Sequence, residues 1–425
     1  MASTVIKHLP ELVAHNVITP ATAKDIEQYY ALKPQPENVS LLTIFASLGG
    51  ILAGLGLILI FAHNWDTFSR TVKTLLALLP LLVFQLSTGY GIIKQKSMRW
   101  KSVSGTLLFF SVGASIAMVS QIYNIPGDLD SYLTTWIIVF LPLLYLLRSD
   151  TVAFLLLLFS TYYIAETGYY SYSHYTRWFY LLFIAAIVPY YVNLIKYRAG
   201  SHVTRAFNWL LPLSIIISFG CFIDNTYNFG FILYGLLLCL VYNMGMLPVF
   251  TKRESNGYSQ LGSAGIVTVL LMMCFKWAWK FMENEVSMPD TALIITGVVL
   301  FTCSFAICYT TRKRLNGFNY AALAFPAIFI AGIVSVDAAW IISNSIALAL
   351  SIDCICRGIN RIDFKTLNFG LFIIAILIIY RFFDTDISFE VRGILFLVLG
   401  AGFFTANYFL AKKKKSLVKT THYEN

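Results

Sequence analysis

Charged residues are scarce in this chain: they make up 12% of its 425 residues, where an ordinary soluble domain has about 25%. Hydrophobic residues, in contrast, make up 58%. One soluble core does not bury that much apolar surface, so the surplus has to face lipid. The composition therefore favours a membrane protein.

The sequence also lacks the motifs that bind nucleotides or metals, or that activate a nucleophile. It contains no P-loop, no G-x-G-x-x-G, no G-x-S-x-G and no H-E-x-x-H. Its seven cysteines show no C-x-x-C spacing and fall in or beside apolar segments, so we interpret them as reduced hydrophobic side chains. No polar region is large enough for a soluble catalytic domain. We therefore expect no metal, no cofactor and no ATP-driven work within this chain.

Fourteen apolar segments are candidate transmembrane helices, each near the length of about 20 residues that crosses a bilayer core. The first, 41–62, is uncharged, and its Ala46, Gly50 and Gly54 form a row of small residues suited to close helix packing in lipid. The others cover approximately 72–93, 103–122, 132–147, 151–166, 178–197, 205–223, 229–250, 259–281, 291–311, 318–336, 338–356, 364–383 and 391–411. The pattern predicts an all-α, polytopic helical membrane protein.

Three regions are expected along the chain: a cytoplasmic amphipathic helical hairpin with its linker at 1–40, a transmembrane domain at 41–411 and a basic cytoplasmic tail at 412–425. In the first region, Thr19 is placed to cap a helix whose first residue is Pro20. The hairpin is either a lid on the cytoplasmic surface or a docking site for a partner.

The placement of basic residues indicates the topology. With the N-terminus in the cytoplasm, 24 of the 31 lysines and arginines fall on the cytoplasmic side of the fourteen spans. The C-terminus is then cytoplasmic too. The net charge of +10 therefore reflects membrane topology, and we do not expect nucleic acid as a partner.

Four stretches on the predicted outer side, 63–66, 121–130, 282–290 and 381–393, combine carboxylates with aromatic side chains. They form either one polar mouth or ordinary solvated loops. We predict that two of them converge on one substrate-binding site, with a smaller contribution from the last. The candidate residues are His63, Asn64, Trp65, Asp66, Gln121, Tyr123, Asp128, Arg381 and Asp384. The D-x-D pair of Asp128 and Asp130 alone is weak evidence for a divalent metal.

Charge within the spans is sparse, which gives little support for an ion-relay transporter. Lys276 and Lys280 lie near a helix end, and Asp353 precedes Arg357 by one helical turn, the spacing of an ordinary ion pair. The tyrosine-rich stretch 162–180 suits either stacking on sugars or an interfacial aromatic belt. A path for an amphipathic or neutral substrate remains open.

A family resemblance rests on L-x-x-H-N-V-I-T-P-x-T at 12–22, GGILAGLGLILIFAHNWD at 49–66 and QIYNIPGD at 121–128. On these residues the chain resembles an uncharacterised family of bacterial multi-pass membrane proteins, domain of unknown function 2157. The stretch 381–400 resembles the ending of such proteins. Asn124 stands where the resemblance implies a histidine, which weakens a histidine-based site in that loop. The resemblance implies a bacterial inner (cytoplasmic) membrane and supplies no reaction.

Three functions remain open. The first is a transporter or flippase-like protein for an amphipathic envelope precursor. The second is a membrane-embedded glycosyl- or acyl-transferase with an outward-facing acidic site, and the third is a non-catalytic scaffold. A lateral cleft between helices favours the first, and a closed outer pocket with converging carboxylates favours the second. The expected partners are membrane lipid and a lipid-linked or otherwise polar envelope substrate.

Overall fold

The protein is an all-α, polytopic membrane protein, described here from a computed structural model. The structure describes residues 9–10, 12–15, 17–32, 65–170, 176–223, 229–251, 256–279, 291–311, 315–384 and 389–423, and within them it contains no strand. The chain divides into two compact units, residues 1–75 and 76–425, which are treated separately.

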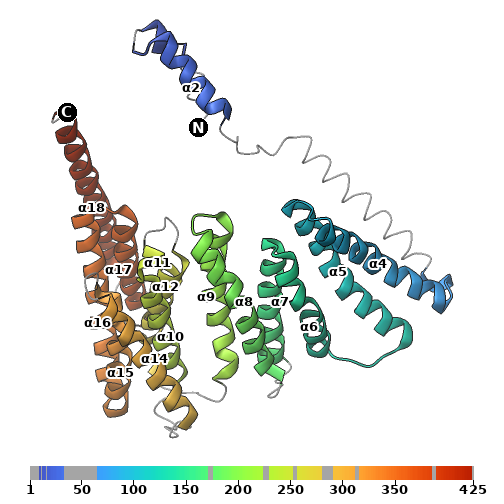
Figure 1. Cartoon of the computed structure of the whole chain (residues 1–425). Helices are drawn as coiled ribbons and strands as arrows, with labels where there is room; N and C mark the ends of the chain where they lie inside the picture. The colour runs from blue at the N-terminus through green and yellow to red at the C-terminus, as the bar shows by residue number, and fades with distance from the viewer. Residues whose placement is uncertain are drawn as a thin grey trace. The chain divides into compact units, whose positions relative to one another are not determined.

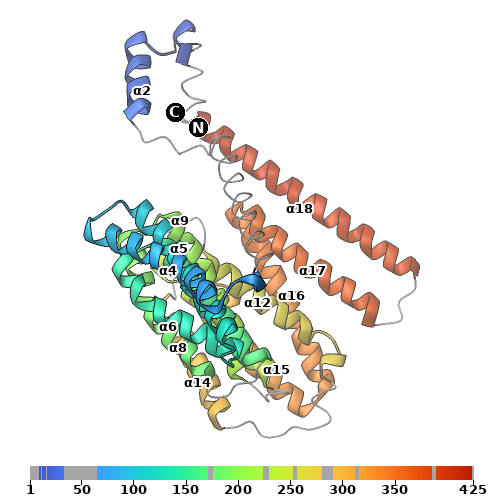
Figure 2. The same cartoon turned by 90° about the vertical axis from the view of Figure 1, so that its right-hand side faces the viewer.

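Helices make up nearly all of the described elements (Figures 1 and 2). They are α2 (Pro20–Leu32), α4 (Arg70–Ile93), α5 (Met98–Tyr123), α6 (Leu129–Leu147), α7 (Asp150–Ala165), α8 (Phe179–Tyr197), α9 (His202–Phe222), α10 (Gly230–Gly245), α11 (Pro248–Thr251), α12 (Gly257–Met273), α14 (Thr291–Thr310), α15 (Gly317–Val334), α16 (Val336–Arg361), α17 (Phe364–Asp384) and α18 (Phe389–Tyr423). Single turns at η1 (Trp65–Thr67), η2 (Glu166–Tyr170) and η3 (Thr176–Trp178) complete the described elements.

Thirteen of the fourteen predicted spans coincide with these helices. Within the described residues, nine helices are long and apolar enough to cross a membrane, and α10, α12, α17 and α18 contain shorter apolar stretches. The first predicted span, 41–62, lies outside the described residues, as do Gly50 and Gly54 within it. The helical membrane fold is confirmed, whereas the count of fourteen stays a prediction.

In the first unit, α2 begins where its sequence predicts. The backbone N–H of Thr22 donates to the Thr19 hydroxyl at 3.2 Å, which satisfies one of the free donors at the helix start, and Pro20 occupies the first position. The cap fixes the helix start, and the cytoplasmic placement of this region remains a prediction.

In the second unit, Trp136 of α6 packs against α5 and forms a hydrogen bond with it. The Trp136 indole donates to the Phe109 carbonyl at 2.8 Å, and its ring lies against Gly113, where an added Cβ would come within 2.4 Å. Phe140 and Phe159 pack around Phe109 at ring-centroid distances of 4.9 and 4.8 Å. This aromatic cluster makes α5 and α6 a rigid support for the surface beside them.

Candidate functional site: a groove along three helices

A groove of 1190 Å³ runs along α4, α5 and α6, and we call it the α4–α6 groove. Small-molecule sites have volumes of about 300–1,000 Å³, so this groove suits a larger molecule. Its walls are mostly apolar. The polar side chains in its lining are Gln85, Thr88, Ser115, Ser120, Asp128, Ser131, Tyr132 and Thr135.

Two hydrogen bonds hold α4 beside α5. The Ser115 hydroxyl donates to the Ala77 carbonyl at 2.9 Å, and the Trp100 indole donates to the Ser87 carbonyl at 3.2 Å. The Trp100 ring also fills the space beside Gly91. Because later residues of α4 meet earlier residues of α5, the two helices run in opposite directions, with contacts at both ends of the shared length.

The Asp128 end of the groove is formed by the start of α6. Asp128 is the N-cap of that helix and accepts from the Ser131 N–H at 3.2 Å. Asp130, only 5% exposed, accepts from the same N–H at 2.7 Å and from the Thr176 hydroxyl at 3.3 Å. A side-chain hydrogen bond with Asp130, followed by those from Ser131, lowers the pKa of Asp128 to about 2. This end therefore carries a fixed negative charge at physiological pH.

The Thr88 end of the groove lies on α4. Thr88 is 2% exposed, and its hydroxyl has no hydrogen-bond partner. Gln85 lies one helical turn earlier, so both side chains are on the same helix face. Gly89 also lines the groove, and an added Cβ there would meet no atom within 4 Å. This end of the groove is therefore neutral, polar and open.

Of the predicted site residues in the second unit, Asp128 lines the groove. Gln121 and Tyr123 are exposed at the end of α5, outside the groove lining. Arg381 and Asp384 lie in the last turn of α17, where only the backbone is described. The structure thus places one candidate directly in the groove.

The other candidates belong to the first unit or fall outside the described residues. Trp65 and Asp66 form the turn η1, and the Lys73 ammonium lies 5.6 Å from the Trp65 ring centroid. His63 and Asn64 are not among the described residues. The convergence of these residues with Gln121, Tyr123 and Asp128 stays a prediction.

Gln85, Thr88 and Gly89 are not among the candidate site residues predicted from the sequence. The sequence does contain a signal for them. One face of the mostly apolar helix α4 carries two polar side chains, Gln85 and Thr88, beside a residue without a side chain, Gly89. A hydropathy average over the whole helix does not reveal this polar face.

Two ion pairs lie within the described part of the C-terminal spans, whereas Lys280 lies outside the described residues. The predicted ion pair between Asp353 and Arg357 is confirmed at 2.6 Å. Lys276 forms an ion pair with Asp337 at 2.9 Å and lies 4.9 Å from the Trp340 ring centroid. Pairing of this kind explains their presence without an ion path. Among the described residues, no group of three or more His, Cys, Asp or Glu side chains is placed to hold a metal ion.

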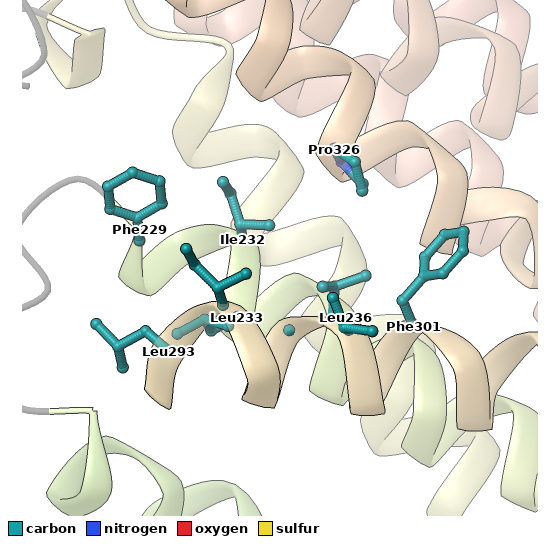
Figure 3. A pocket seen from close by; sticks show the side chains of 10 residues that line it. Phe229, Ile232, Leu233, Leu236, Leu293, Phe301 and Pro326 are labelled. Atoms are coloured by element: carbon teal, nitrogen blue, oxygen red, sulfur yellow. The ribbon is translucent and has the colours of Figure 1, made fainter. Parts of the chain in front are cut away.

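A second cavity, of 330 Å³, lies between α10, α14 and α15 (Figure 3). Its labelled side chains include Phe229, Leu233, Leu293, Phe301 and Pro326, and the remaining lining residues are also apolar or glycine. With no polar group to orient a ligand, this cavity offers space for hydrocarbon but no recognition.

Comparisons with known proteins bear on the groove. Searches of curated proteins and of solved structures found no match. A family model described as "Predicted membrane protein (DUF2157)" matches residues 10–153, which include all of α4, α5 and α6. The match extends over 144 of the 425 residues, from 10 to 153 inclusive. Over this part, which holds the entire groove, the chain is similar to the predicted membrane proteins of DUF2157.

Proposed function

We propose that the protein binds an amphipathic envelope molecule in the α4–α6 groove and moves it across the membrane. The observation that carries this proposal is the groove itself, a long, open and mostly apolar cleft of 1190 Å³ along three transmembrane helices. Its apolar walls suit hydrocarbon chains, and its polar ends suit a head group. A lateral cleft is the feature that separates this function from the alternatives.

The charge of the groove selects the head group. Asp128 is the one charged side chain in the lining, and no lysine, arginine or histidine accompanies it among the lining residues. An anionic head group would be repelled by this carboxylate, whereas an amine or a polyol would pair with it. The ligand class is therefore an amphipath whose head group is neutral overall or cationic.

A transferase with an outward-facing acidic site is the second candidate. Asp128 and Asp130 support it, because the two carboxyl groups accept from the same Ser131 N–H and so lie side by side, as in general acid–base pairs. The groove around them is open and apolar, however, and lacks further converging carboxylates. A scaffold without a ligand would need no such groove.

The proposal places the protein in a bacterial inner membrane with both termini in the cytoplasm. The support is the distribution of basic residues, 24 of 31 of which fall on one side of the predicted spans. The Asp128 end of the groove then faces outward and the Thr88 end faces the cytoplasm.

Reporter fusions test this topology. Fusions after Lys101 and at the C-terminus should report a cytoplasmic location, since both positions follow an even number of predicted spans. A fusion after Asp128 should report the opposite side. A periplasmic signal from either of the first two would contradict the proposed orientation.

Gly89→Leu tests the function. The new side chain would enter the open space beside Gly89. It should therefore occupy part of the groove without pushing neighbouring side chains aside. In vesicles that contain the purified protein, we expect fluorescent phosphatidylethanolamine to exchange between leaflets at least about tenfold faster than in protein-free vesicles. Gly89→Leu should abolish most of that gain. The measurement is the fraction of fluorophore that an external reductant can reach over time.

Gly402→Leu is the matched control. Gly402, on α18, also has no atom within 4 Å of an added Cβ and lies outside the groove lining, so this variant should behave as wild type. Equal exchange rates for Gly89→Leu and wild type would overturn the proposed function. Bound lipid without exchange would contradict the proposed movement across the membrane.

A further inference from the structure

Thr88 differs from nine other threonines within the described helices. A threonine within a helix commonly donates its hydroxyl to the carbonyl four residues earlier. That bond is present at Thr74, Thr134, Thr135, Thr161, Thr167, Thr268, Thr296, Thr302 and Thr405. The Thr88 hydroxyl makes no such bond, although it is buried.

A buried hydroxyl without a partner lowers stability, because it has lost its hydrogen bonds to water and gained none in the protein. Thr88 lines the groove, so the space it borders is where a partner can lie. Gln85 adds an exposed amide one turn away, and Gly89 leaves the neighbouring position open. The Gln85 amide is exposed beside the groove, whereas the Thr88 hydroxyl has almost no exposed surface as placed and reaches the same space by rotation about its Cα–Cβ bond.

The depth of Thr88 in the bilayer indicates which part of a lipid lies beside it. Thr88 is six residues before Lys94, the first charged residue after α4, a distance of about 9 Å along a helix. The hydrocarbon core is about 30 Å thick, so this level is close to its edge, where acyl chains join the polar part of a lipid.

The two ends of the groove are too far apart to serve one head group. Ser115 and Ala77 lie at the same level because they share a hydrogen bond. From that level, Thr88 is eleven residues away along α4, about 16 Å, and Ser120 is five residues away in the opposite direction, about 8 Å. The total, about 24 Å, is close to the thickness of the hydrocarbon core.

We infer that Thr88 and Gln85 form a second binding position in the groove, which recognises the carbonyl oxygen of an acyl linkage, an ester or an amide. This inference rests on the proposed function. Both side chains offer hydrogen-bond donors, and a carbonyl is an acceptor that lies at this depth. An ion does not suit the position, because this end of the groove holds no charge to compensate the loss of hydration.

Thr88→Val tests this position, because valine keeps the shape and removes only the hydroxyl. The probes are dioleoyl phosphatidylethanolamine and its diether analogue, which lacks the two carbonyls. Native mass spectrometry of the full-length protein in detergent measures the ratio of bound ester lipid to bound ether lipid. We expect wild type to favour the ester about three- to tenfold, as one net hydrogen bond predicts, and Thr88→Val to bind both nearly equally.

The melting temperature separates recognition from a structural role. Because Thr88→Val removes a hydroxyl that has no partner, the lipid-free variant should melt at the same temperature as wild type or higher. An unchanged ester preference, or a lost preference together with a lower melting temperature, would overturn the inference. Thr302→Val, whose hydroxyl donates to its own helix at 2.8 Å, is the control and should keep the ester preference.

The Gly89→Leu variant distinguishes the two proposals. If it loses both lipids while Thr88→Val keeps the ester preference, only the second binding position is wrong. If Gly89→Leu binds both lipids as wild type does, the proposed function is wrong as well. A cross-link between cysteines introduced by Gly89→Cys and Gly54→Cys, with exposed Cys303 and Cys356 replaced by serine, would place the chain's own predicted first span in the groove and overturn both.

Discussion

Gly262→Leu should destabilise the protein by about 3 kcal/mol, the upper part of the range for overpacking. Gly262 lies on α12 at its contact with α10, where an added Cβ would meet the backbone N of Tyr242 at 2.6 Å and its Cα at 2.7 Å. On the same interface, a Cβ at Gly245 would come within 2.5 Å of the backbone N of Ser259. Backbone atoms cannot move aside as a side-chain end can, so the two helices would have to separate.

The measurement is the melting temperature of the purified protein in detergent, together with its abundance in the membrane. Gly402→Leu again serves as the control, because its open surroundings leave only the intrinsic gain from replacing a helical glycine. Equal melting temperatures for Gly262→Leu and Gly402→Leu would show that α10 and α12 are not in close contact.

Asn319→Ala should cost about 2–4 kcal/mol, since it removes two kinds of bond at once. The Asn319 side chain donates to the buried Asn243, whose own amide donates to the Ser304 hydroxyl at 2.7 Å. It also completes the capping box of α15 by accepting from the Asn316 N–H at 2.8 Å. The substitution would leave the Asn243 carbonyl buried and without this donor.

Thermal unfolding in detergent measures the effect of Asn319→Ala. Asn407→Ala is the matched control, because the Asn407 amide bonds to the exposed Asn368 at 2.9 Å and its loss leaves no buried side-chain carbonyl without a donor. If both variants melt within a degree of each other, the buried network contributes little to stability.

The positions of the helices follow from the sequence because apolar length and capping act locally. The Thr19–Pro20 start of α2 and thirteen of the predicted spans illustrate this. Ends are less certain where charged residues continue a helix: α16 reaches Arg361, five residues beyond the apolar segment that predicts it. In the tyrosine-rich stretch, sequence alone did not separate buried Tyr163 and Tyr180 from exposed Tyr170.

The groove depends on how helices are spaced, which hydropathy does not encode. The position of α4 is fixed by hydrogen bonds between residues 38 and 13 positions apart, from Ser115 to Ala77 and from Trp100 to Ser87. Each of these residues looks unremarkable in the sequence. The predicted outer mouth relied instead on residue types in loops, and of those in the second unit it identified Asp128 as part of the groove.

The shortness of α10 has a consequence for hydration. Sixteen residues make a helix about 24 Å long, less than the thickness of about 30 Å of a hydrocarbon core. Gly245, the last residue of α10, is buried within the protein, so its carbonyl needs a partner from the protein itself. The Asn256 amide takes the place of a water molecule there, donating to the Gly245 carbonyl at 2.7 Å while its oxygen accepts from the first turn of α12. A side chain of the protein thus does what water does at an exposed helix end. The end of α10 is thereby protected from fraying.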